Sequence, residues 1–235
     1  PLQLKLRAPG DTGRIIVGLI DTPIQSLGAN LDPFLLPSIA IMGDAQLDPN
    51  RPTHSTTMAE TILASLQAMT GGSTSVQILP VDVYGNNPST TTFEVALGIY
   101  KAVNAGANPI NLSLGGNDDS SFLHNVIQQA HQQGVLFFAA AGNTPVTTPT
   151  YPAAYPGVVA VTAGDRKGNI ADYANRGSFV AIVAPGVNVI YFKDQPYYVS
   201  GTSAATAYAT GMAAGMADSK GKSLSEVEAA LRSML

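Results

Sequence analysis

Cysteine is absent from the 235 residues, which excludes disulfide bonds and cysteine-based zinc sites without identifying the compartment. Charged residues are scarce at 12%, well below the usual quarter or so. The net charge is −4 and no basic stripe runs along the sequence, so nucleic acid is not an expected partner. Apolar runs stay well short of the roughly 20 residues of a membrane span, so a membrane is not expected either.

An initiator methionine and a signal peptide are also missing, because the chain begins at Pro1, and we interpret it as a processed or excised piece. No Pro-, Gly- or Ser-rich linker and no run of charge divides the sequence, so we expect one domain over residues 1–235. Hydrophobic residues make up 45%, enough for a large core, and 23 Gly and 16 Pro favour many tight turns between buried strands.

Strand-like and helix-like segments alternate along the chain. Apolar, β-branched runs typical of buried parallel strands occupy residues 14–20, 76–83, 110–114, 135–141, 158–163 and 179–184. A hairpin is predicted from residues 187–192 and 197–200 around Asp194-Gln195-Pro196. Helices are predicted from 54 to 71, from the capping box at 91–94 to about 104, over 122–130, over 203–217 and after 223, whereas 22–53 is loop-like. This order predicts an α/β three-layer sandwich, with a mostly parallel twisted sheet and helices on both faces.

The stretch from Val199 to Ala217 combines a Ser-Gly-Thr-Ser turn with a run of Ala and Gly. Such a run predicts a helix packed tightly against a sheet. Ser203 would lie in its first turn, where unpaired N–H groups and the positive end of the helix dipole converge. A serine there can attack a carbonyl while its own N–H helps to hold the oxyanion. Serine at a helix start is also an ordinary N-cap, and this stretch alone does not decide between the two roles.

Two further residues fall where sites form in such sheets, beyond the carboxyl ends of the strands. Asp21 ends the first predicted strand and His54 begins a helix. Neutral imidazole is the best base near pH 7 for a serine hydroxyl, and a carboxylate orients the ring. An aspartate at a strand end often caps a turn, and a lone histidine is usually a surface residue. The joint occurrence with Ser203 is more specific than any one of the three.

Six segments, in order, resemble the motifs of the subtilisin-like serine proteases, the subtilases: "VGLIDTPI", "THSTTMAETI", "INLSLGG", "AAAGN", "YPAAYPGVVAVTA" and "SGTSAATAYATG". The order Asp, His, Ser is that of subtilisin. The resemblance implies that Asp21 orients the ring, His54 is the base and Ser203 the nucleophile. It also implies that Asn143 donates to the oxyanion.

The resemblance extends to substrate binding. The strands that flank the family's primary specificity pocket match Ser113, Leu114, Gly115, Ala140, Ala141 and Gly142, and its base matches Thr150. An extended peptide could add to such a strand edge. The small residues would leave room for a side chain, although tight sheet packing would also explain them. Because the pocket wall "TYPAAYP" has no Asp or Glu, we expect large apolar or aromatic residues before the scissile bond.

Calcium is the metal that the resemblance raises, because many members interrupt the helix after the catalytic histidine with a calcium-binding loop. The corresponding segment 65–72 has no Asp, Glu or Asn, and its apolar residues continue the helical stripe. We therefore expect no required cofactor and assign no metal ligands. Asp32, Asp44 and Asp48 could still supply carboxylates to a weaker calcium site elsewhere.

The resemblance implies a serine endopeptidase acting on proteins or peptides, with a pro-segment removed before Pro1 and a secreted or extracytoplasmic location. The chain departs from the family with Ser55 and Thr57, where Gly and His are usual, and with Ala207 in place of a proline. One alternative is a catalytically silent subtilase fold used for binding. A lipase or esterase is another, but residues 201–205 lack the second glycine of its G-x-S-x-G elbow.

Overall fold

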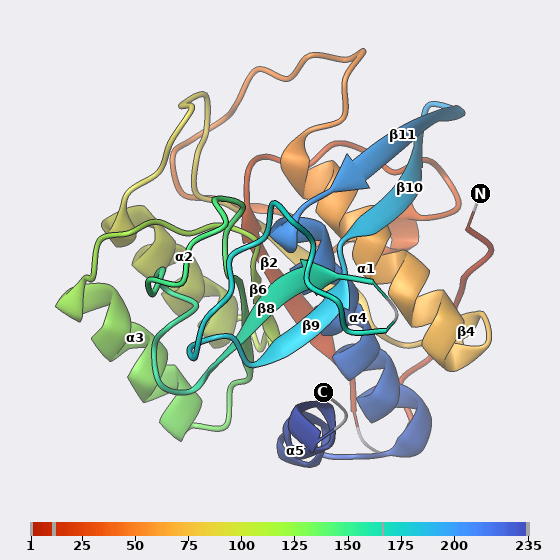
Figure 1. Cartoon of the computed structure of the whole chain (residues 1–235). Helices are drawn as coiled ribbons and strands as arrows, with labels where there is room; N and C mark the ends of the chain where they lie inside the picture. The colour runs from red at the N-terminus through yellow and green to blue at the C-terminus, as the bar shows by residue number, and fades with distance from the viewer. Residues whose placement is uncertain (1, 11–12, 166, 234–235) are drawn as a thin grey trace.

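The computed structural model describes residues 2–10, 13–165 and 167–233. Its centre is a parallel seven-stranded sheet in the order β3-β5-β2-β6-β7-β8-β9, with helices on both faces (Figure 1). In chain order the strands are β2 (Ile16–Asp21), β3 (Ile39–Ala40), β5 (Gln77–Asp82), β6 (Ile110–Leu112), β7 (Phe137–Ala140), β8 (Val158–Gly164) and β9 (Ile182–Pro185). The predicted α/β sandwich is confirmed.

The helices divide the core into two layers. Helices α2 (Thr92–Asn104) and α3 (Ser121–Gln132) cover one face of the sheet, and α1 (His54–Thr70) and α4 (Thr202–Lys220) cover the other (Figure 1). The last helix, α5 (Leu224–Ser233), packs against α4. Both predicted capping boxes are present, at Thr91 with Glu94 and at Ser223 with Glu226, so local sequence fixed where α2 and α5 begin.

Helix α4 is buried along most of its length and lies close to α1. A Cβ atom added to Gly211 would lie 2.5 Å from the carbonyl oxygen of Ile62, and one added to Gly215 would lie 2.7 Å from Cβ of Met69. Glycine is unfavourable inside a helix, so its presence here reflects the close approach of the two backbones. The predicted buried helix of small residues is thus confirmed, and α1 runs without interruption to Gly71, which ends it at φ 67°.

Strand β5 contains a proline, Pro80, which has no backbone N–H to donate to a neighbouring strand. The N–H groups of Gln77 and Val83 donate to carbonyls of β2 and its approach. By the two-residue period of a strand, residue 80 faces the opposite neighbour, β3. That strand pairs only with Val81 and Asp82, so no ladder bond is lost at Pro80.

Several short elements lie in regions that carried no local signal. The segment 22–53 contains β3 and a 3-10 turn, η1 (Asp32–Phe34), and β1 (Lys5–Leu6) pairs in parallel with β4 (Ser73–Thr74). The strand predicted over 179–184 starts only at Ile182, and that predicted over 14–20 runs from Ile16 to Asp21. Among the described residues, no helix is both long and apolar enough to cross a membrane.

The predicted hairpin exists, but its turn was misplaced. Strands β10 (Val187–Phe192) and β11 (Gln195–Ser200) are antiparallel, and Gln195 pairs with Phe192. The turn is therefore Lys193-Asp194, with φ of 51° and 63°. A two-residue turn with positive φ at both positions matches the twist of the strands, which favoured it over the Pro-containing turn. Strand β11 leads directly into α4.

Candidate active site

Three of the predicted site residues lie at the carboxyl edge of the sheet. Asp21 is the last residue of β2, between β5 and β6. His54 is the first residue of α1, and Ser203 is the second residue of α4. Because parallel strands end at one edge, the two helix starts and the strand end converge there.

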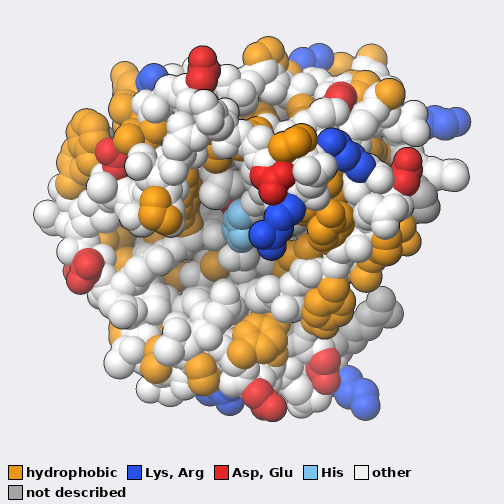
Figure 2. Space-filling model, turned by 90° about the horizontal axis from the view of Figure 1, so that it is seen from above, with side chains coloured by type: hydrophobic (Ala, Val, Ile, Leu, Met, Phe, Trp, Pro, Cys, Tyr) orange, Lys and Arg blue, Asp and Glu red, His pale blue; other side chains and the backbone are white. Residues whose placement is uncertain are grey.

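Asp21 and His54 form a pair. The Nδ1 atom of His54 lies 2.8 Å and 2.9 Å from the two carboxylate oxygens of Asp21, which is fully buried. The backbone N–H of Thr22 also donates to this carboxylate, at 2.6 Å. A buried carboxylate needs such donors because it has lost its hydration. The His54 side chain is 41% exposed, and Figure 2 shows a histidine surface within a hollow of this face.

The Asp21 carboxylate raises the pKa of His54 above its ordinary value, first through its charge and further through the hydrogen bond, while desolvation works in the opposite direction. The bond to Asp21 also fixes the tautomer. Because a carboxylate only accepts, Nδ1 carries the proton, and Nε2 of the neutral ring keeps a lone pair.

Gln25 holds the segment that presents His54. Its amide donates to the carbonyls of Asp48 (2.8 Å) and Arg51 (3.0 Å) and accepts from the N–H of Thr53 (2.8 Å). Thr53 is the N-cap of α1, since its hydroxyl accepts from the N–H of Thr56. The start of α1 is therefore fixed by a side chain outside the helix, which sequence reasoning did not single out.

Ser203 is not a helix cap. The N-cap of α4 is Gly201, whose φ of 137° is unfavourable for other residues. The hydroxyl of Ser203 instead donates to the carbonyl of Ser113 at 3.1 Å. No hydrogen bond joins Ser203 to His54 within the described residues. Such bonds are often long in unliganded sites and tighten only with substrate.

Asn143 has a fixed orientation. Its Oδ1 accepts from the backbone N–H of Thr202 (2.9 Å) and lies 3.1 Å from the Thr202 hydroxyl. A backbone N–H can only donate, so the amide oxygen must face Thr202 and Nδ2 must face away from it. Nδ2 has no protein acceptor in the described part of the chain. Thr202, which the sequence did not single out beyond its place in the motif, is what orients this amide.

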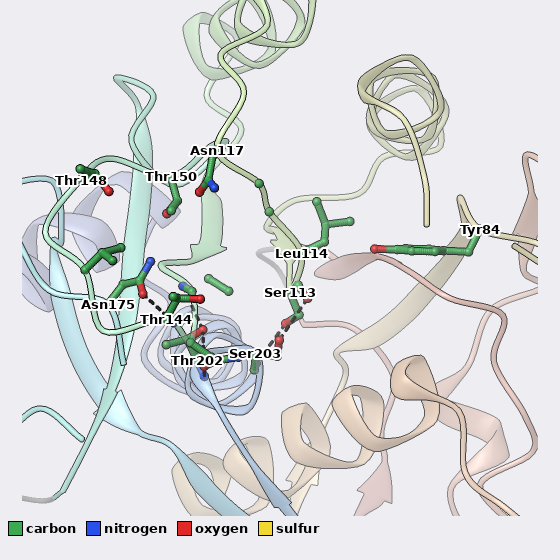
Figure 3. Close-up of a pocket in the computed structure, with 16 residues that line it drawn as sticks. Tyr84, Ser113, Leu114, Asn117, Thr144, Thr148, Thr150, Asn175, Thr202 and Ser203 are labelled. Atoms are coloured by element: carbon green, nitrogen blue, oxygen red, sulfur yellow. Dashed lines mark hydrogen bonds between the residues drawn. The ribbon is translucent and has the colours of Figure 1, made fainter. Parts of the chain in front are cut away.

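A cavity of about 510 Å³ adjoins Ser203 and Asn143 (Figure 3). Its walls include the predicted residues Ser113, Leu114, Gly115, Ala140, Gly142 and Thr150. Several other lining residues were not predicted from the sequence, namely Tyr84, Gly116, Asn117, Thr144, Val146, Thr148, Asn175 and Thr202. Most of these lie in loops, where no periodicity marks the side that faces a cavity.

Ala141 is the one predicted substrate residue that is not on the wall of this cavity. It is fully buried, and its carbonyl accepts from the Thr150 hydroxyl (2.6 Å) and from Nδ2 of Asn175 (2.7 Å). Gly142, by contrast, is glycine for a structural reason. Its φ is 108°, and an added Cβ would lie 2.5 Å from Nδ2 of Asn175. Tight packing therefore explains Gly142, independently of any room it leaves for substrate.

No group of three or more His, Asp or Glu side chains able to hold a metal lies among the described residues. Asp32, one of the carboxylates considered for calcium, accepts from the hydroxyl of Ser26 (2.6 Å) and from the N–H of Leu27 (2.7 Å). Helix α1 is continuous from His54 to Thr70.

The chain matches the family model described as "Subtilase family" over residues 12–234. It is 32% identical to "Thermitase" of Thermoactinomyces vulgaris, covering 92% of this chain and 78% of that protein. It is also 32% identical to "Thermophilic serine proteinase" of Bacillus sp. (strain AK1), covering 94% of this chain but 56% of that protein. A structure of the protease domain of PatA matches with a TM-score of 0.77 and 28% identity, over 91% of this chain and 84% of that one.

The chain therefore belongs to the subtilase family, as the motifs indicated. It spans about half the length of several of the curated relatives that it matches. Family membership accounts for the shared α/β sandwich.

The raised pKa of His54 predicts how activity depends on pH. A histidine that acts as a base must be neutral, and Asp21 favours the protonated form. We therefore expect kcat/KM to rise with pH through a midpoint above 6.5, the ordinary pKa of histidine. Asp21→Asn removes the charge, so the imidazole should then titrate at lower pH. Proton NMR of the histidine Cε1–H signals measures this directly. The chain has only three histidines, so His124→Gln and His131→Gln assign the signals. An unchanged His54 midpoint in Asp21→Asn would contradict the assignment of Asp21.

Proposed function

We propose that this chain is a serine endopeptidase in which Ser203 is the nucleophile, His54 the general base and Asp21 the group that orients the base. The proposal rests on the hydrogen-bonded pair of Asp21 and His54 at the carboxyl edge of the sheet. Ser203 and Asn143 line the same cavity, and the Nδ2 group of Asn143 faces away from Thr202. The family relation supports the same chemistry, since its named members include serine proteinases.

The proposed reaction begins with attack of Ser203 Oγ on the carbonyl carbon of the scissile peptide bond. The hydroxyl proton passes to Nε2 of His54, and the adjacent Asp21 carboxylate stabilises the imidazolium. The C–N bond then breaks, and His54 returns the proton to the leaving amine. Water attacks the resulting acyl-enzyme with His54 again as base, which releases the acid and regenerates Ser203.

Charge on the carbonyl oxygen develops during both attacks. The Nδ2 group of Asn143 and the backbone N–H of Ser203 are the proposed donors. The N–H of Ser203 lies in the first turn of α4, where no carbonyl within the helix can accept it. Thr202 holds the Asn143 amide, and α4 holds the N–H of Ser203. Both donors are therefore in fixed positions, and little reorganisation is needed when the charge forms.

One observation favours the alternative of a catalytically silent subtilase fold that only binds its partner. The Ser203 hydroxyl is hydrogen-bonded to the carbonyl of Ser113 and not to His54. We favour the enzyme because rotation about one side-chain bond of Ser203 would release its hydroxyl, whereas the fixed groups are already in place. A lipase or esterase is disfavoured by the family match over residues 12–234.

The cavity is the proposed pocket for the side chain that precedes the scissile bond, with the peptide extended along Ser113, Leu114 and Gly115. No charged side chain lines it. The Thr150 hydroxyl already donates to the Ala141 carbonyl, so its proton is not available to a substrate group. A lining without charge supports an uncharged residue at this position, and the family resemblance leads us to propose a large apolar one.

We also propose, on the family resemblance alone, that the protein acts outside the cytoplasm after removal of a pro-segment. The N-terminal sequence of the native protein recovered from culture medium, compared with that from cells, tests both statements.

The triad proposal predicts the behaviour of single and double variants. Ser203→Ala or His54→Ala should lower turnover by about 10⁴–10⁶-fold with the fold intact, and the double variant should be no worse than either, because the residues act as a unit.

Asn143→Ala should lower kcat by about 10²–10³-fold, a magnitude adopted from the equivalent donor of subtilisin. A serine-directed fluorophosphonate should label wild-type Ser203 but not Ser203→Ala. A folded wild-type chain that stays unlabelled would instead support the silent fold.

The pocket predicts cleavage after large apolar or aromatic residues. Discrimination among them should be modest, since one methylene in an apolar pocket is worth about 1–3 kcal/mol. Cleavage-site profiling of a peptide library, with and without a serine-protease inhibitor, measures the preference. A strict requirement for Arg or Lys would refute this assignment, because the cavity has no side chain to pair with either.

The continuous α1 predicts a chain that does not depend on calcium, because no loop bulges from the helix to offer carbonyl ligands. A tight site would stabilise the folded state in proportion to RT ln(1 + [L]/Kd) and would show in thermal unfolding. We expect a chelator to change Tm very little. A drop of tens of degrees, reversed by calcium but not by magnesium, would mean that other residues build a site.

A further inference from the structure

A line of polar side chains, here called the polar seam, crosses the contact between α4 and β6. On the helix it consists of Ser203 and Thr210, which are seven residues apart and therefore on one face. Opposite them are Asn111 of β6 and Ser113 just beyond it, which are two residues apart and therefore on one side of the strand. The proposed mechanism uses Ser203 but gives no role to Asn111 or Thr210.

The seam is a continuous chain of hydrogen bonds. The Thr210 hydroxyl lies 2.9 Å from Oδ1 of Asn111, and Nδ2 of Asn111 donates to Oγ of Ser113 at 2.9 Å. The Ser113 hydroxyl donates in turn to the backbone carbonyl of Ser203 at 3.0 Å. The single proton of the Thr210 hydroxyl has two acceptors at 2.9 Å, Oδ1 of Asn111 and the Thr206 carbonyl. Because an amide oxygen only accepts, Thr210 is the donor in the bond that joins it to Asn111. Every bond thus runs in one direction, toward Ser203.

All three supporting side chains are buried: Asn111 and Thr210 are fully inaccessible and Ser113 is 5% exposed. Burying hydrogen-bonded polar groups gives little net stability over apolar groups of the same shape, but leaving one of them unpaired is costly. The seam therefore penalises any rotation or sliding of α4 against β6 more than an apolar contact would, because such movement breaks bonds that water cannot replace.

We propose that Asn111, the Ser113 hydroxyl and Thr210 are positioning residues that set where α4 presents Ser203. This inference rests on the proposed function of Ser203 as nucleophile. Ser113 also lines the cavity, and its carbonyl accepts a hydrogen bond from the Ser203 hydroxyl. The position of Ser113 therefore affects both the proposed nucleophile and the proposed peptide-binding segment. Reactivity is sensitive to displacements of about 1 Å at a reacting atom, which can change rate about 10²-fold.

Thr210→Val tests the seam, since valine has nearly the shape of threonine but carries a methyl group in place of the hydroxyl that bonds to Asn111. We expect kcat per titrated active site to fall about tenfold, with KM and the pH midpoint unchanged, because the substrate cavity and the Asp21–His54 pair are untouched. Thr210→Ser restores a hydroxyl and should recover kcat to within about twofold of the wild type.

Thr206→Val is the matched control. Thr206 is equally buried and lies on the same helix, but its hydroxyl donates to the Thr202 carbonyl within α4 and not to the sheet. Its kcat per active site should stay within about twofold of the wild type, because the hydrogen bond that is lost lies within α4.

Active-site titration and the rate constant of fluorophosphonate labelling separate positioning from mere destabilisation. If Thr210→Val has a lower Tm but an unchanged kcat per site and labelling rate, the seam is structural only and the inference is wrong. An equal loss in Thr206→Val would also overturn it.

Should Thr210→Val not fold, Asn111→Leu breaks the middle of the chain without changing a cavity residue and must show the same loss of kcat per site. A folded wild-type chain that is not labelled overturns the proposed function and this inference together, whereas labelling without a variant effect overturns only the inference.

Discussion

The close approach of α4 to α1 and the sheet is the constraint on which the site depends. A helix built mostly from small residues can lie so near its neighbours that an added Cβ at Gly211 would meet the Ile62 carbonyl. The start of α4 is thereby brought to the end of β6, within hydrogen-bond distance of Ser113. A larger side chain along this contact would move the helix as a body, and Ser203 would move with it.

The position of β2 in the sheet imposes a second constraint, which is electrostatic. Asp21 lies where the strand ends between two neighbours, so its carboxylate is fully buried and cannot be hydrated. The N–H of Thr22 and the ring of His54 are the donors that compensate for the lost water. The burial that makes the charge costly also makes it effective, because its field on His54 is weakly screened. Stability and the proposed base chemistry thus share one pair.

Strong local signals were enough to predict most of the large elements. The pairs Thr91 with Glu94 and Ser223 with Glu226 marked two helix starts correctly, because a capping box is satisfied within four residues. Signals that depend on pairing were weaker. The hairpin turn was placed at Asp194-Gln195-Pro196, although strand twist selected Lys193-Asp194. Strand β3 has two residues and exists only because β5 lies beside it.

The sequence by itself determined the fold class, the family and the identity of the polar residues at the strand and helix ends. These follow from periodicity, caps and ordered motifs, all of which are local or one-dimensional. Only the tertiary structure decided that Ser203 bonds to Ser113, that Thr202 orients Asn143, and that Ala141 turns away from the cavity. The first two depend on groups brought together across long separations, 90 residues for Ser113 with Ser203 and 59 for Thr202 with Asn143. Such partners are set by how α4 packs on the sheet, which no short stretch of sequence specifies.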